Sequence, residues 1–150
     1  MNSPMPRALR RAALAVSTAA LTTAAGAHSF VFTLGDAAAA THYFGVICSG
    51  EGGNDTDHLF LELRTTTSNA PAVSAQVIKG PVATNTTDPV GGDVAFSPAT
   101  RTRGGNGLYQ VLINKAGPGV VTFAVNAHCL DVTGTQHTGT DGVVYQYQDR

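Results

Sequence analysis

The fold of this 150-residue chain is decided by the stretch Gly119-Val-Val-Thr-Phe-Ala-Val-Asn-Ala-His-Cys-Leu130. Successive side chains of an extended strand point to opposite faces, so the alternation in this stretch separates an apolar face from a polar one. The apolar face carries Val121, Phe123, Val125, Ala127 and Cys129, and the polar face carries Thr122, Asn126 and His128. The stretch therefore predicts a half-buried β-strand.

A second strand pattern, from Gly107 to Asn114, comes immediately before this one. The link between them, Lys115 to Gly119, is rich in the glycine and proline that form turns. Two alternating segments joined by such a link are typical of a β-hairpin, so we expect these two strands to pair.

The rest of the chain also has strand patterns and turn formers. It contains 17 glycines but only two glutamates and two lysines, a composition that disfavours helices. The polar stretch 82–92 predicts an irregular connection with one short edge strand, and further strands are predicted at 42–48, 58–67, 73–79, 93–97 and 143–148. About seven short strands without intervening helices predict an all-β, two-sheet antiparallel sandwich.

The N-terminus has the pattern of a secretory signal peptide. Arg7, Arg10 and Arg11 precede an uncharged run that ends in small residues at Ala27. We expect a signal peptide at 1–27, an N-terminal segment at 28–41 and the sandwich at 42–150; a second small-residue site places the alternative cut after residue 40. The mature chain is then secreted or periplasmic, with no stable membrane span after cleavage.

The two cysteines, Cys48 and Cys129, lie in strand patterns at opposite ends of the mature chain. Export exposes them to an oxidising compartment, so we predict that they form a disulfide. The alternative is a single thiolate metal ligand, but no methionine follows Met5 to complete a blue-copper site.

The paired patterns Gly107-Leu-Tyr-Gln-Val and Gly119-Val-Val-Thr-Phe-Ala-Val, with a disulfide between an early and a late strand, carry a family resemblance. The chain resembles the immunoglobulin-like and fibronectin-III-like accessory domains of exported bacterial proteins. The resemblance implies an immunoglobulin-like sandwich, and fold alone implies no particular activity.

Charge and motifs disfavour two classes of function. A chain that begins at His28 has six Lys and Arg against ten Asp and Glu, and Arg101 and Arg103 are its one local basic pair, so we expect no nucleic-acid binding. Ser49 is not in a nucleophile elbow, and Glu51 and Glu62 have no spacing that indicates an acid–base pair. We therefore expect no catalytic residues and no enzyme activity.

Two sets of residues are hypothetical metal ligands. Cleavage after residue 27 would give His28 a free amine that, with its imidazole, chelates Cu(II), and His128 or His137 could complete the site. The acidic loop 51–57 offers Glu51, Asp55 and Asp57 as oxygen ligands for Ca²⁺. Separate surface imidazoles and a solvated acidic turn are the alternatives.

Together these features predict an exported, disulfide-linked β-sandwich that acts as a binding or structural module without a cofactor. The partner is an unidentified protein or glycan. The alternative function is a periplasmic copper-binding protein that uses His28 with His128 or His137.

Overall fold

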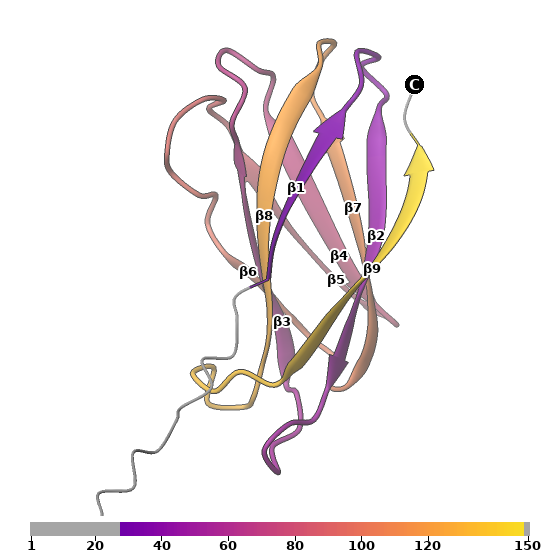
Figure 1. The fold of residues 1–150 in the computed structure, drawn as a ribbon, viewed down its shortest axis with the longest axis vertical. Helices are drawn as coiled ribbons and strands as arrows, with labels where there is room; N and C mark the ends of the chain where they lie inside the picture. Colours follow the sequence, from indigo (N-terminus) through magenta and orange to yellow (C-terminus); the bar gives the residue numbers. More distant parts are fainter. Residues whose placement is uncertain (1–27, 149–150) are drawn as a thin grey trace, which may run out of the picture.

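Nine β-strands and no helix make up residues 28–148, which are the residues that the computed structural model describes (Figure 1). The predicted signal peptide, 1–27, lies outside them. The strands are β1 (His28–Leu34), β2 (Thr41–Ser49), β3 (His58–Thr65), β4 (Val73–Lys79), β5 (Val82–Asp88), β6 (Thr100–Arg103), β7 (Gly107–Lys115), β8 (Val121–Leu130) and β9 (Gly139–Gln148).

The strands form two antiparallel sheets that face each other. The four-stranded sheet has the order β1-β8-β3-β6, and the five-stranded sheet has the order β5-β4-β7-β2-β9. The predicted all-β, two-sheet antiparallel sandwich is confirmed. No helix long and apolar enough to cross a membrane occurs among the described residues.

Strand β8 has the two faces that its sequence predicts. All five side chains of its apolar face have an exposed fraction of 0%, and they pack in the core with leucines of β3 and with apolar residues of β2, β4 and β7. His128 and Asn126, on the other face, are half-buried at the outer surface of the four-stranded sheet. The strand is held on both edges, by β1 and by β3.

The disulfide between Cys48 and Cys129 is confirmed. Cys48 is in β2 of the five-stranded sheet and Cys129 is in β8 of the four-stranded sheet, and their Cα atoms are 5.6 Å apart. Both cysteines are buried in the core. The cross-link therefore joins the two sheets through the interior.

The predicted hairpin between 107–114 and 119–130 is wrong. β7 pairs with β2 and β4, whereas β8 pairs with β1 and β3, so the link after Lys115 crosses from one sheet to the other. The buried ammonium of Lys115 holds this crossing, because it donates to the carbonyls of Gly35, Asp36 and Gly119. β7 and β8 each lie between two other strands of their own sheet.

The sandwich also begins earlier and has more strands than expected. β1, in the segment 28–41, pairs with β8 over all seven of its residues and ends at the fully buried Leu34. β5 is a seven-residue strand at the edge of its sheet, within the stretch 82–92.

The predicted strand at 93–97 is wrong, and β6 lies just after it. The carboxylate of Asp93 accepts a hydrogen bond from the Ala95 backbone at 3.0 Å, which makes a local turn, and Val94 is exposed. Ser97 then bonds to the backbone of Leu63 on β3, and the ladder with β3 begins only beyond Pro98. Local side-chain hydrogen bonds here replace a strand ladder.

Two buried polar groups stabilise the loops. Asp88, at the end of β5, accepts hydrogen bonds from the backbone N–H groups of Thr65 at 2.5 Å and Val90 at 3.2 Å, and so connects the two sheets. The hydroxyl of Tyr109 donates to the carbonyl of Gly105 at 2.8 Å. Burial, together with the charge of Asp57, raises the pKa of Tyr109 to about 12.

Candidate functional site

The loop between β8 and β9, residues 131–138, folds back against the end of the sandwich and forms the candidate site (Figure 1). Its first half is a turn around Asp131, whose carboxylate accepts hydrogen bonds from the Thr133 hydroxyl at 2.6 Å and backbone N–H at 3.1 Å. The Thr133 hydroxyl is the main reason that the pKa of Asp131 is lowered. The turn is therefore fixed by its own side chains.

The second half of the loop is bound to strand β8. His137 forms an isolated bridge with Leu130, and the Thr138 N–H donates to the Cys129 carbonyl at 2.9 Å. The Thr138 hydroxyl also bonds to the buried hydroxyl of Thr56, at 2.7 Å. His137 is thus held by its own bridge to Leu130 and by the two bonds of the next residue, Thr138. Its backbone therefore has a defined position beside β8.

This folding brings His137 beside His128. The ring centroids of the two imidazoles are 5.0 Å apart, with an angle of 29° between their planes. His128 also lies against Phe60 of β3, at a centroid distance of 5.7 Å. Burial lowers the pKa of His128, the neighbouring His137 and His28 lower it further, and Glu62 opposes them, so the neutral imidazole is favoured.

A pocket of about 250 Å³ lies on one side of His137, over the outer face of the four-stranded sheet. Its strand residues are in register, because Phe60 is opposite His128 of β8 on one side and opposite Arg101 of β6 on the other. The guanidinium of Arg101 lies 5.3 Å from the Phe60 ring centroid. We call this the Phe60 pocket; its lining is Phe60, Glu62, Arg101, His128, Leu130, Gly134, Thr135 and His137.

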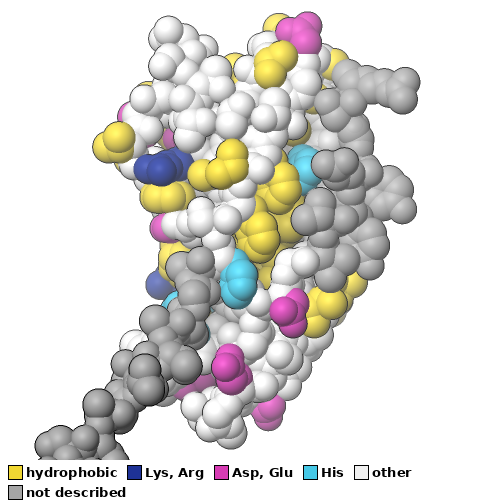
Figure 2. All heavy atoms as spheres, viewed as in Figure 1, with side chains coloured by type: hydrophobic (Ala, Val, Ile, Leu, Met, Phe, Trp, Pro, Cys, Tyr) yellow, Lys and Arg dark blue, Asp and Glu magenta, His cyan; other side chains and the backbone are white. Residues whose placement is uncertain are grey.

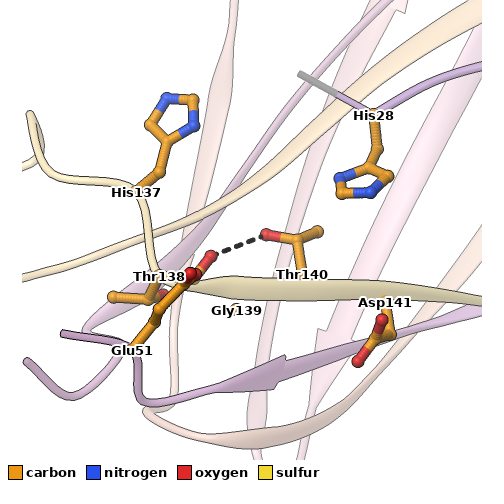
Figure 3. Close-up of a pocket in the computed structure, with 7 residues that line it drawn as sticks. All are labelled: His28, Glu51, His137, Thr138, Gly139, Thr140 and Asp141. Atoms are coloured by element: carbon orange, nitrogen blue, oxygen red, sulfur yellow. Dashed lines mark hydrogen bonds between the residues drawn. The ribbon is translucent and has the colours of Figure 1, made fainter. Parts of the chain in front are cut away.

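A second pocket, of about 300 Å³, also has His137 in its lining and is shown in Figure 3. It is lined by His28, Glu51, His137, Thr138, Gly139, Thr140 and Asp141. Figure 3 shows His28 and His137 on opposite sides of Thr140, whose hydroxyl bonds to the Thr138 carbonyl at 3.2 Å.

The structure thus brings together two of the three predicted copper ligands. His128 and His137 are adjacent, whereas His28 begins β1, opposite Ala127, and stacks on Phe30 with a centroid distance of 6.3 Å. Within residues 28–148, no three His, Cys, Asp or Glu side chains are grouped so that they could hold a metal ion. The free amine in the copper hypothesis depends on the preceding residues, which lie outside those described.

The three predicted calcium ligands have different surroundings. Glu51 lines the pocket with His28 and His137, whereas Asp55 and Asp57 line another pocket, of about 310 Å³. Asp55 accepts a hydrogen bond from the Asn106 amide at 2.9 Å. Asp57 bonds to the ring of His58 at 2.8 Å and lies 3.6 Å from the Arg103 guanidinium. Two of these carboxylates therefore already have partners in the protein.

A row of aromatic side chains follows β1 toward the middle of the molecule. His28, Phe30 and Phe32 stack in sequence, and Figure 2 shows hydrophobic side chains at the surface between β1 and β9. A Cβ atom at Gly142 of β9 would lie 2.8 Å from the Phe30 ring. Glycine at this position therefore permits the close approach of β9 to Phe30.

Phe60, Glu62 and Arg101 were not predicted as members of one site. No motif in the sequence assigns Phe60 to a site. Glu62 is a candidate only for an acid–base pair, and Arg101 only for a basic pair. Their common feature is an outward position on β3 or β6, which becomes visible only once the register of these strands with β8 is known.

No protein family, curated protein or solved structure was found to match this chain. The function is therefore inferred from the residues of the site.

Proposed function

We propose that this chain is an exported, disulfide-stabilised binding module that binds a hydroxyl-rich ligand, a glycan, in the Phe60 pocket. The observation that carries the proposal is the combination of groups around Phe60. A half-buried aromatic ring is surrounded by a guanidinium, a carboxylate and two imidazoles.

These groups match the two kinds of surface that a sugar ring presents. The Phe60 ring can contact the C–H face of a sugar, and the apolar contact contributes affinity. Arg101 donates hydrogen bonds, Glu62 accepts them, and an imidazole in its neutral form can do both. A pocket with an apolar floor and a few polar groups at its rim is typical of a small-molecule site.

Export is supported by the disulfide. Disulfides form and persist in oxidising compartments, and Cys48–Cys129 links the two sheets through the core. Secretion or a periplasmic location is therefore part of the proposal. Expression of the full chain in a bacterium, followed by cell fractionation and intact-mass measurement, tests it: the exported fraction should contain a shortened, oxidised chain.

Strand β1 bears on the position of cleavage. A cut after residue 40 would remove all of β1, including the fully buried Leu34 and its pairing with β8. A cut after residue 27 leaves the sandwich whole. We therefore expect the intact mass to correspond to a chain that begins at His28.

Ligand binding is tested by titrating the exported protein with defined oligosaccharides. A neutral trisaccharide of N-acetylglucosamine and a trisaccharide of galacturonic acid are suitable probes, because they differ in charge. Two-dimensional NMR should show saturable shifts of the His128 and His137 ring signals with at least one probe. Phe60→Ala should abolish them.

The chain offers a matched control for this variant. Arg64 lies 4.9 Å from the Phe96 ring centroid, which is a second Arg-over-Phe pair, and neither residue lines the Phe60 pocket. Phe96→Ala should leave saccharide binding unchanged. Absence of binding by both probes, or equal loss in the two variants, would overturn the proposed glycan site.

A further inference from the structure

The two imidazoles at the rim of the Phe60 pocket lie close together, with their ring centroids 5.0 Å apart. We infer that His128 and His137 bind one divalent transition-metal ion, Cu(II) in preference to Zn(II), in a two-histidine site that is open to solvent. The inference rests on the proposed function in one respect, because the ion would lie at the rim of the proposed ligand site.

The separation of the rings fits one shared ion. Ligand nitrogens about 2.0–2.1 Å from an ion place two imidazole centroids about 4.5 Å apart at neighbouring positions of a tetragonal Cu(II) site and about 5 Å apart in a tetrahedral site. The centroids of His128 and His137 are 5.0 Å apart. The ring planes are 29° apart in a stacked arrangement, so the side chains have to rotate to direct one nitrogen of each toward a common point.

The backbone on both sides of the pair is fixed. His128 lies in β8 opposite Phe60 of β3, one residue beyond the last pair with β1 at Ala127, and immediately before the disulfide at Cys129. His137 is fixed to the same strand by its bridge to Leu130 and by the bond from Thr138 to Cys129. Both ligands therefore stay close together without the metal, and less ordering is needed when it binds.

The surroundings leave coordination positions for other ligands. The pair faces a pocket of about 250 Å³, and the described residues bring no third His, Cys, Asp or Glu side chain into a metal-holding group with it. One oxygen of Glu62 is bonded to the Asn126 amide at 2.9 Å. Water, or an oxygen of a bound ligand, would therefore complete the coordination.

The ligand type selects the class of metal. Imidazole nitrogen suits copper, nickel and zinc, and among divalent first-row ions Cu(II) binds a given nitrogen site most tightly. Calcium and magnesium prefer oxygen ligands and should not compete. This site differs from an N-terminal copper chelate, since His28 is paired with the core-facing Ala127 of β8, whereas His128 is on the outer face of the same sheet.

The test is a titration of the full exported chain, freed of metal, with CuCl₂ and then with ZnCl₂. In the His28→Gln chain, which lacks the imidazole of an N-terminal chelate, one Cu(II) should bind, with a visible d–d band and an electron paramagnetic resonance spectrum that shows two coordinated nitrogens. His128→Gln and His137→Gln should each remove saturable Cu(II) binding, and His28→Gln should retain it. ZnCl₂ should compete only at a higher concentration than CuCl₂.

Three outcomes would overturn the inference: no saturable Cu(II) binding; binding that survives both His128→Gln and His137→Gln; or binding that is lost in His28→Gln alone. His137 is exposed on a loop, so its variant keeps the test valid even if His128→Gln does not fold. Saccharide titration of the metal-free protein tests the proposed function separately, because the Phe60→Ala result does not require copper.

Discussion

Removal of the disulfide should cost this protein much of its stability. Cys48 and Cys129 are 81 residues apart in the sequence, and the cross-link restricts the unfolded chain over that whole span. The chain-entropy relation gives about 4.5 kcal/mol for a loop of this length. A domain of this size is typically stable by about 5–15 kcal/mol, so the loss would approach the lower end of that range.

The perturbation is made in three variants: Cys48→Ala, Cys129→Ala and the double variant. Each single substitution breaks the same cross-link, so the three should lose similar free energies of unfolding, about 4–5 kcal/mol each. The measurement is urea unfolding at equilibrium, followed by circular dichroism. The denaturant slope should also rise, because the uncrosslinked unfolded chain exposes more surface.

Two results would refute this reasoning. One is a loss below about 1 kcal/mol in every variant, which would mean that the cross-link does not limit the unfolded chain as the loop length requires. The other is a double variant whose loss equals the sum of the two single losses, because two residues of one bond cannot act independently.

Three further perturbations test the buried polar groups and the first strand. Asp88→Ala should destabilise the protein by about 2–3 kcal/mol in urea, because the buried N–H of Thr65 loses its acceptor. The pKa of Tyr109 is raised from 10 to about 12 in the folded protein. The neutral phenol therefore contributes fully to the free energy of unfolding below pH 10, and this contribution is lost as the pH rises toward 12. That contribution is about 2–3 kcal/mol, and absorbance at 295 nm should show one late-ionising tyrosine. A chain that begins at Thr41 lacks β1 and should fail to fold cooperatively in thermal unfolding, whereas a chain that begins at His28 should fold.

Each of these predictions has a control. Asp93 also accepts a backbone hydrogen bond but is exposed, so Asp93→Ala should change stability far less than Asp88→Ala. Tyr109→Phe should remove the late phase of the absorbance titration, and persistence of that phase would assign it to another tyrosine. Cooperative unfolding of the chain from Thr41, with unchanged stability, would show that β1 is dispensable.

The strands were predictable from the sequence because burial imposes a period of two. Val121, Phe123 and Val125 share one face of the strand, opposite Thr122 and Asn126, and the structure buries the first set completely. The placement of β7 and β8 in different sheets was not predictable in the same way. Turn residues such as Pro118 and Gly119 indicate that the chain reverses, but not whether it stays in one sheet or crosses to the other. The crossing is stabilised by hydrogen bonds between residues that are far apart in the sequence, including those of Lys115 to Gly35 and Asp36.

The candidate site was predictable only in part. Histidine is a common metal ligand, so His128 and His137 were predictable as candidate ligands. They are nine positions apart in the sequence, with a polar loop between them. Their proximity depends on the bridge between Leu130 and His137, which no spacing rule gives. Phe60 and Arg101 join the site through strand register alone.

The covalent link between β2 and β8 also determines how the molecule would respond to mechanical tension. A force applied to the two ends of the chain can draw out only the segments before Cys48 and after Cys129. The segment between the two cysteines would extend by about 3.3–3.6 Å per residue, but it carries no load while the bond is intact. When the protein is pulled from its ends, β1 and β9 would therefore detach, and most of the chain would not be extended.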